Sequence, residues 1–252
     1  MKRIIGGLIL VLSLNGTLWA DKITIFAASD LKFALDDVKA EFLKDNPKDE
    51  IETIYGSSGK GMHQIENGAP FDIFFSANMD FVEKLYQKGD ISTKPKMYAL
   101  GRVVIWSKHK NFDVSKGFDN LKAPWVQKIA IAHPGHAPYG EKAKQSLESI
   151  GIYNDIESKL VLGENISQTA GFISSEAADI GVIALSLALA PTIANTEFNK
   201  YYLIDKKLHE PLNQGYGITK VGSTKSLSQK FYDFMENPKA DAIMKKYGFV
   251  ID

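Results

Sequence analysis

Hydroxyl-bearing residues stand where a predicted strand gives way to a predicted helix. Thr53 to Tyr55 are β-branched and aromatic residues that favour a strand, and Gly56 to Gly59 (GSSG) form a tight turn with two hydroxyl groups. The first N–H groups of a helix lack partners within the helix and lie at its positive end, so hydroxyls beside them suit an anion. The stretch from Thr53 to Ala77 is therefore predicted to form half of a site for a small oxyanion. An ordinary helix N-cap is the alternative for this stretch taken alone.

Four predicted turns share this setting, each directly after a strand and directly before a helix. They contain Ser29, Ser57 with Ser58, Pro138-Tyr139-Gly140, and Asn165-Ile166. Ligands of open α/β folds bind at the carboxyl ends of parallel strands, where such turns lie. Two of the turns fall in each half of the chain, so closing the halves together would bring four helix N-termini around one point.

The elements that position these turns alternate along the chain. The predicted strands cover residues 22–28, 50–55, 71–75, 103–107, 128–133, 159–162 and 179–184. One predicted helix runs from Leu31 and another begins at the Gly56–Gly59 turn, and the others cover residues 81–86, 141–150, 167–174 and 226–247. Residues 201–204 are expected to return to the first part of the fold, which residues 215–219 and the last helix complete. This alternation predicts parallel sheets with helices on both faces.

The fold class is therefore α/β, with two lobes that each contain a mostly parallel sheet flanked by helices. Lobe one is predicted to comprise residues 21–101 and 205–252, and lobe two residues 102–204. The chain crosses between the lobes twice, near residues 101 and 204. Two crossings of one boundary are typical of a protein whose lobes move about a hinge.

Residues 1–20 have the form of a cleavable export signal. Two basic residues precede an apolar run from Ile4 to Leu14, which is too short to span a bilayer. Ala20 is a suitable last residue before cleavage, although Leu18 stands where a small residue is usual. The chain has no cysteine, which excludes a disulfide framework and a lipid-anchored cysteine. We expect an exported, periplasmic protein.

The net charge of the chain limits the kinds of molecule that it can bind. The chain has 30 basic and 30 acidic residues, and removal of the signal takes away Lys2 and Arg3 but no acidic residue. The resulting small negative balance argues against nucleic acid or an anionic membrane surface as the partner. A bound anion must then be held by local groups, because the field of the whole protein does not attract it.

Five stretches together indicate a family. They are AASDLKFAL (27–35), YGSSGKGMHQIENGAPFDIFFSA (55–77), GHAPYGEKAKQSL (135–147), ADIGVIALS (178–186) and MKKYGF (244–249). In these stretches, which cover essentially the whole chain after the signal, the sequence resembles the periplasmic molybdate-binding proteins of ABC transporters. The resemblance implies the two-lobed periplasmic-binding-protein fold in a monomer. It also implies capture of molybdate or tungstate and its delivery to the membrane permease of an ABC importer.

In that family the oxyanion is held intact by serine-type hydroxyls and backbone N–H groups, with no coordinated metal, cofactor or arginine. The resemblance assigns hydroxyl contacts to Ser58, with Ser57 beside it, and to Ser29. It assigns backbone N–H contacts to Tyr139 and Ile166, so the Tyr139 phenol is expected to matter little.

Two positions depart from the family pattern. Asp30, rather than Ser29, stands where some members have the serine when the first turn is matched without a gap. Because a carboxylate would repel a dianion, we expect Asp30 to point away and to offer only its N–H. Residues 184–186 (Ala-Leu-Ser) stand where some members have a tyrosine ligand, so that contact is expected to be missing.

A site made only of donors selects among oxyanions. Monohydrogen phosphate carries a proton that would find no acceptor, at a cost of about 1–3 kcal/mol. Sulfate has no such proton and must be rejected by size, because its shorter bonds leave some donors out of reach. Tungstate, which is nearly the size of molybdate, is not expected to be distinguished.

Alternatives from other classes remain open. Sulfate or phosphate could be the ligand of the same site. A metal ion is suggested by His133 and His136, spaced as H-x-x-H, and by Tyr201-Tyr202, which resemble the paired tyrosines of ferric-ion-binding relatives. For these residues a polar turn beside the pocket and an ordinary strand are favoured.

An enzyme acting on an oxyanion ester is the weaker alternative. GSSGKG lacks the spacing of a phosphate-binding GxxxxGK[ST] loop, no G-x-S-x-G elbow occurs, and a thiol nucleophile is impossible. Lys60 and Arg102 are the cations nearest in sequence to the site and the hinge, and for Lys60 a solvated helix position is favoured.

Overall fold

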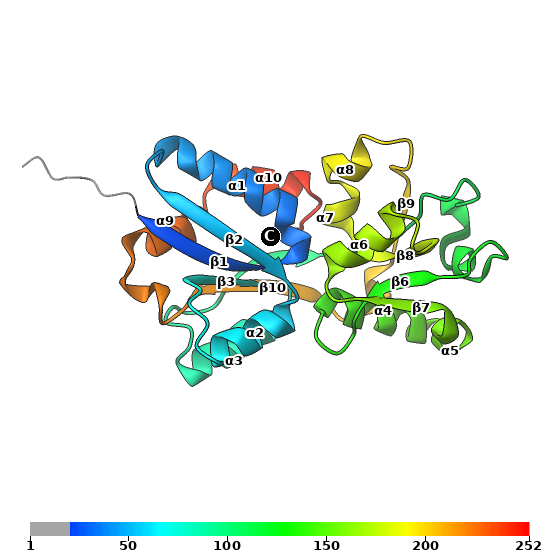
Figure 1. The fold of residues 1–252 in the computed structure, drawn as a ribbon, viewed down its shortest axis with the longest axis horizontal. Coiled ribbons are helices and arrows are strands. Elements are labelled where there is room, and N and C mark those ends of the chain that lie inside the picture. Colours follow the sequence, from blue (N-terminus) through cyan, green and yellow to red (C-terminus); the bar gives the residue numbers. More distant parts are fainter. Residues whose placement is uncertain (1–20, 252) are drawn as a thin grey trace, which may run out of the picture.

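Two five-stranded sheets, one in each of two lobes, organise the protein. The structure is a computed structural model that describes residues 21–251, so the predicted export signal at residues 1–20 lies outside the described residues. The lobes lie side by side along the long axis of the molecule (Figure 1). No helix within the described range is both long and apolar enough to cross a membrane.

The two sheets have the same topology. Their strand orders are β2-β1-β3-β10-β4 and β7-β6-β8-β5-β9. The strands are β1 (Lys22–Ala28), β2 (Glu50–Gly56), β3 (Ile73–Ser76), β4 (Lys96–Gly101), β5 (Val103–Trp106), β6 (Ile129–Ala132), β7 (Leu160–Gly163), β8 (Ile180–Ala184), β9 (Tyr201–Leu203) and β10 (Leu212–Ile218). In each sheet only one strand, β10 or β5, runs antiparallel to both of its neighbours. The predicted α/β fold with mostly parallel sheets is confirmed.

The reversed strand follows from the path of the chain. β4 ends where the chain leaves the first sheet, so β5 begins at the boundary between the lobes and runs away from it. After the chain returns from the second sheet, β10 likewise begins at the boundary between the lobes and runs away from it. The other strands therefore point their carboxyl ends at the opposite lobe, which is where open α/β folds place ligands.

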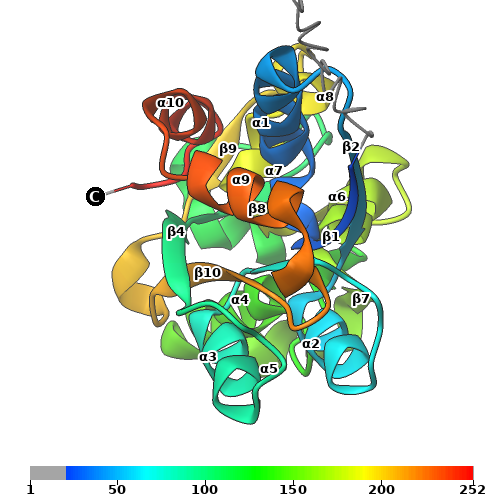
Figure 2. The same ribbon diagram turned by 90° about the vertical axis from the view of Figure 1, so that its left-hand side faces the viewer.

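Helices cover both faces of the first sheet. They are α1 (Lys32–Asp45), α2 (Ser58–Glu66), α3 (Met79–Lys88), α9 (Ser226–Phe234) and α10 (Pro238–Lys246). Figure 2 shows α1, α9 and α10 on one side of the sheet and α2 and α3 on the other. Successive side chains of a strand point to opposite faces, so Ile25 joins the core beneath α1 while Phe26 joins the core beneath α2.

The second sheet is covered in the same way. Its helices are α4 (Pro138–Ser149), α5 (Tyr153–Ile156), α6 (Ile166–Ser174), α7 (Leu185–Ala188) and α8 (Pro191–Ala194). α4 and α6 lie on opposite faces of the sheet (Figure 1) and both contact β6 and β8. Short 3-10 segments cover Ser29–Leu31, Val114–Lys122, Glu157–Lys159, Lys206–Leu208 and Gly222–Thr224.

Three expectations from sequence were wrong in detail. The predicted return at residues 201–204 does not occur there, because β9 pairs with β5 at the edge of the second sheet. The single helix expected over residues 226–247 is two helices, because Pro238 cannot continue a helix and instead begins α10 with Asn237 as its cap. α4 begins at Pro138, three residues earlier than expected, because proline suits the first helical position.

An aromatic cluster in the first lobe offers a test of the core. Phe75 is fully buried and stacks on Tyr216, with ring centroids 5.0 Å apart. We expect Phe75→Ala to lower the free energy of unfolding by about 3–5 kcal/mol, because the cavity cannot close. Tyr86→Ala, at a side chain that is 45% exposed, is the control and should cost less than about 1 kcal/mol. Urea denaturation measures both, and equal losses would contradict the assignment of Phe75 to the core.

Candidate functional site

A small pocket lies between the carboxyl ends of the strands of the two sheets. It is lined by Ala28, Ser29, Asp30, Gly56, Ser57, Ser58, Ala77, Ala137, Pro138, Tyr139 and Ile166. The pocket is very small in this arrangement of the lobes, with a cavity volume of about 10 Å³, roughly that of one water-sized sphere. All six site residues expected from sequence line it, so the fold brings together turns that are far apart in the chain. That these residues bind a ligand stays a prediction.

Three helices direct their N-termini at this pocket. Ser58 is the first residue of α2, Tyr139 the second of α4 and Ile166 the first of α6. N–H groups at these positions have no partner inside their own helix, and each helix adds a partial positive charge at this end. One helix comes from the first lobe and two come from the second, so donors from both lobes meet across the pocket.

Ser58 can donate into the pocket through its side chain. Its hydroxyl oxygen is buried and accepts a hydrogen bond from the Ala77 N–H at 2.9 Å. This bond uses a lone pair and leaves the hydroxyl proton for another acceptor. The Ala77 N–H, at the end of β3, therefore orients the Ser58 hydroxyl as a donor.

Ser57 and Gly59 instead join the lobes. The Ser57 hydroxyl donates to the His136 carbonyl oxygen at 2.5 Å and lies 2.9 Å from the His136 Nδ1 atom. The Gly59 N–H donates to the same carbonyl oxygen at 3.0 Å. Sequence reasoning placed Ser57 beside the ligand, but in the structure its hydroxyl is already engaged by the opposite lobe.

Ser29 makes a second connection between the lobes. Its hydroxyl oxygen lies 3.1 Å from the Asn165 Oδ1 atom and accepts from the Ser167 N–H at 3.2 Å. The Ser167 hydroxyl donates to the Ser29 carbonyl oxygen at 2.8 Å. Ser29 thus contacts the N-terminus of α6, and Ser167 is a residue of this region that sequence reasoning missed.

Asp30 forms a buried network with two residues from other elements. Its Oδ2 atom accepts from the Tyr139 hydroxyl at 3.0 Å and from the Gln214 Nε2 atom at 3.1 Å, and Gln214 also donates to the Tyr139 oxygen at 2.8 Å. Burial raises the pKa of the Asp30 carboxyl group to about 6, while these hydrogen bonds lower it. Sequence reasoning expected only the backbone of Tyr139 to act, and it missed Gln214, which lies on β10.

Two further contacts pack this network tightly. Gly101, at the end of β4, lies so close that a Cβ atom there would be 2.4 Å from the Gln214 Nε2 atom and 2.5 Å from the Tyr139 hydroxyl oxygen. The Ser186 hydroxyl donates to the Asp30 carbonyl oxygen at 2.8 Å. Ser186 belongs to the segment that lacks the family's tyrosine, and here it fixes the backbone of the first turn.

Charged residues also pair between the two lobes. Lys60 on α2 forms an ion pair with Glu164, which also lies 3.5 Å from the His136 Nε2 atom. Burial lowers the pKa of His136, and the nearby Glu164 partly offsets this effect. Lys60, for which a solvated position was favoured, thus also contacts the second lobe.

The residues that suggested a metal ion have other contacts. His133 and His136 stack with their ring centroids 4.6 Å apart. Tyr201 and Tyr202 lie on the edge strand β9, where Tyr202 packs against Phe118. Within residues 21–251 no group of three or more His, Cys, Asp or Glu side chains is arranged to hold a metal ion.

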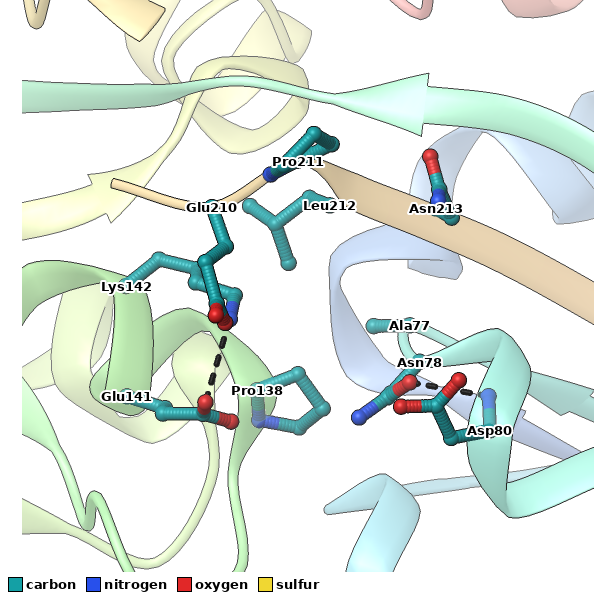
Figure 3. A pocket seen from close by; sticks show the side chains of 10 residues that line it. All are labelled: Ala77, Asn78, Asp80, Pro138, Glu141, Lys142, Glu210, Pro211, Leu212 and Asn213. Carbon is teal, nitrogen blue, oxygen red and sulfur yellow. Dashed lines mark hydrogen bonds and ion pairs between the residues drawn. The ribbon is translucent and has the colours of Figure 1, made fainter. Parts of the chain in front are cut away.

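A larger hollow lies beside the pocket and shares Ala77 and Pro138 with it. Figure 3 shows Glu141, Lys142 and Glu210 facing Asp80 across this hollow. Lys142 is buried and is bonded to Glu141 at 3.0 Å and to Glu210 at 2.9 Å. The hollow thus has one cation, which is already paired, and three carboxylates, and this net negative charge disfavours an anion. The smaller pocket is therefore the better anion site.

Comparisons with known proteins agree with this architecture. Residues 23–250 match the family model described as bacterial extracellular solute-binding protein. The chain is 30% identical over 231 residues to the molybdate-binding protein ModA of Azotobacter vinelandii, covering 91% of this chain and 90% of that protein. It is 32% identical over 199 residues to ModA of Rhodobacter capsulatus, covering 79% and 76%.

Solved structures extend the likeness to three dimensions. The periplasmic molybdate-binding protein of Azotobacter vinelandii matches with a TM-score of 0.84 at 30% identity, covering 91% of this chain and 99% of that one. The sulfate-binding protein SubI of Mycobacterium tuberculosis matches with a TM-score of 0.73 at 14% identity, covering 91% and 86%. The second likeness shows the fold alone.

The contact between Gly59 and His136 allows a test of how the lobes meet. A Cβ atom at Gly59 would lie 2.7 Å from the His136 carbonyl oxygen, so Gly59→Ala should hold the lobes apart. Closure can be measured by the disulfide yield between Lys60→Cys and Glu164→Cys, since the chain has no cysteine of its own. We expect Gly59→Ala to lower this yield. Gly171→Ala, which adds a Cβ atom in open space, should leave it unchanged. Equal yields in the two variants would show that the contact does not limit closure.

Proposed function

Because this chain belongs to the family of bacterial extracellular solute-binding proteins, we propose that it binds molybdate between its two lobes and delivers it to the membrane permease of an ABC importer. Tungstate is an equivalent ligand in this proposal. The relatives named for molybdate cover nearly the whole chain, and the family resemblance found in the sequence is confirmed.

The composition of the pocket is the main observation that supports an oxyanion as the ligand. The pocket is small, is bordered by three helix N-termini, and has no lysine or arginine among its lining residues. Oriented N–H and hydroxyl groups can stabilise a dianion without a cation, because their partial charges are fixed in place before the ligand arrives. We propose that Ser58 donates through its hydroxyl and that Tyr139 and Ile166 donate through their backbone N–H groups.

Ser29, Ser57 and Asp30 have a different part in the proposed site. The hydroxyls of Ser29 and Ser57 are occupied by the second lobe, so they contribute chiefly to closure around the anion. Asp30 offers its N–H to the anion, while its carboxyl group is held by Tyr139 and Gln214. The anion and these contacts together favour the closed arrangement of the lobes.

The proposed transport cycle needs two rigid lobes and a hinge. We propose residues 21–101 with 205–252 as one lobe and 102–204 as the other, which matches the membership of the two sheets. The protein acts in the periplasm as a monomer after removal of residues 1–20. It is a carrier and not an enzyme, needs no cofactor, and holds molybdate as the intact oxyanion without direct coordination of the metal.

Titration calorimetry with molybdate, tungstate, sulfate and phosphate tests the ligand directly. In chelator-treated buffer we expect tight one-to-one binding of molybdate and tungstate and much weaker binding of the other two. Sulfate is the informative control because it has the same charge and shape with shorter bonds. Preferential binding of sulfate or phosphate would show that molybdate is not the ligand. The absence of binding heat with all four anions would reject an oxyanion site.

Ser58→Ala tests the proposed hydroxyl donor. The variant removes one hydrogen bond to a charged ligand, so we expect molybdate affinity to fall about tenfold, equivalent to about 1.4 kcal/mol. Ser223→Ala is the matched control, because Ser223 is exposed and, within residues 21–251, its hydroxyl donates only to the Lys220 carbonyl oxygen. Calorimetry of both variants decides the point, and wild-type affinity in Ser58→Ala would remove Ser58 from the site.

A further inference from the structure

Asp30 is a fully buried carboxyl group with no cation beside it. It is 1% exposed and lines the proposed anion pocket. Its hydrogen-bond partners, the Tyr139 hydroxyl and the Gln214 amide, are neutral. Among residues 21–251 no lysine, arginine or histidine forms an ion pair with it, although Lys142 and Lys60 pair with carboxylates elsewhere in the cleft. A buried carboxylate without a cation is costly, and a nearby anion makes it more so.

The hydrogen-bond network around Asp30 also has fewer donors than acceptors. The Asp30 Oδ1 atom and the Gln214 Oε1 atom are both buried, and within the described part of the chain neither has a donor in good hydrogen-bond geometry. The Asp30 and Leu31 backbone N–H groups lie near the Asp30 carboxyl group and lower its pKa, but less than burial raises it. Two unsatisfied acceptors within one three-residue network are unusual, because buried polar atoms are generally paired. A single added proton on Oδ1 would turn one of these acceptors into a donor and would remove the negative charge at the same time.

We propose that Asp30 takes up one proton when the oxyanion binds, so that the pocket holds a neutral carboxylic acid beside the dianion. This inference rests on the proposed function, because it requires an anion in the pocket lined by Asp30. The proton comes from solvent and ends on a carboxylate oxygen of Asp30, and no other bond forms or breaks. Asp30 is then a residue that couples affinity to pH, while its N–H remains a donor to the anion.

The direction of the effect follows from the charges. Burial already raises the pKa of Asp30 to about 6 in the structure without an anion. A dianion in the same pocket raises it further, because a like charge disfavours the ionised form. Between these two pKa values the free protein is ionised at Asp30 and the complex is protonated. In that range the affinity should fall about tenfold for each unit of rising pH.

Other titratable groups near Asp30 are not expected to take up a proton when the anion binds. Tyr139 on α4 and Tyr98 on β4 face it, and burial raises the pKa of both well above the ordinary value, so they stay neutral. Ser186 contacts only the Asp30 carbonyl oxygen. His136 shifts in the opposite direction, because burial lowers its pKa and favours its neutral form. At about pH 7.5 a histidine with an ordinary pKa is already mostly neutral, so its contribution is small.

Calorimetry in several buffers measures the proton directly. Tungstate or molybdate is titrated into the purified protein at about pH 7.5 in buffers of different ionisation enthalpy. The slope of the observed enthalpy against that ionisation enthalpy is the number of protons taken up. We expect a slope approaching one proton per anion in the wild-type protein. A slope of zero with tight binding would overturn the inference and leave the proposed function standing.

Variants then assign the proton to Asp30. Asp30→Asn keeps an acceptor for Tyr139 and Gln214 but cannot titrate, so we expect the uptake and the pH dependence of affinity to disappear. Tyr139→Phe removes a donor from the ionised carboxylate, so the pKa of free Asp30 should rise and the pH range of uptake should move upward. His136→Gln is the control, and the uptake should persist in it.

The outcomes separate the two proposals. Uptake that survives in Asp30→Asn, or that disappears in His136→Gln, would place the proton elsewhere and overturn the inference. If Asp30→Asn fails to fold, the wild-type slope and the shift in Tyr139→Phe decide the question. Failure of both anions to bind the folded wild-type protein would instead reject the proposed function.

Discussion

The proposed site depends on one constraint: an anion without a neighbouring cation must be surrounded by donors that are already oriented. Helix N-termini supply such donors, and they do so only where a strand ends and a helix begins. Both sheets point most of their strands at the opposite lobe, so the turns carrying Ser58, Tyr139 and Ile166 converge on one pocket. The shared strand order of the lobes, the position of the pocket and the absence of a lysine or arginine among its lining residues all fit this constraint.

Contacts between the lobes complete the site. The His136 carbonyl oxygen accepts from Ser57 and Gly59, and Ser29 exchanges hydrogen bonds with Ser167 at the start of α6. These bonds hold the two lobes together beside the pocket. A ligand shifts the balance between open and closed lobes only by its differential affinity, and in the proposed mechanism the donors of the second lobe provide that difference.

Asp30 is the exception among the lining residues, because it places an acidic group in a pocket otherwise surrounded by donors. A carboxyl group in the wall of the proposed anion pocket opposes the ligand unless it is neutral, and burial already raises the pKa of Asp30 to about 6. The same network reaches Gly101, at the end of β4 where the chain passes between the lobes. Asp30, Tyr139 and Gln214 therefore link the pocket to the region about which the lobes are proposed to move.

The sequence by itself determined the α/β class, the turns that line the pocket and most of the order of the elements, but it did not reveal β4. These features depend on local signals: apolar periodicity, glycine and proline at turns, and hydroxyls after strands. Only the tertiary structure decided the pairing of β9, the use of Ser29 and Ser57 between lobes, and the partners of Asp30. Gln214 is 184 residues from Asp30 and Ser57 is 79 residues from His136, so no local pattern could reveal these contacts. A hydrogen bond across a cleft depends on where two lobes meet, and that is fixed by packing over the whole chain.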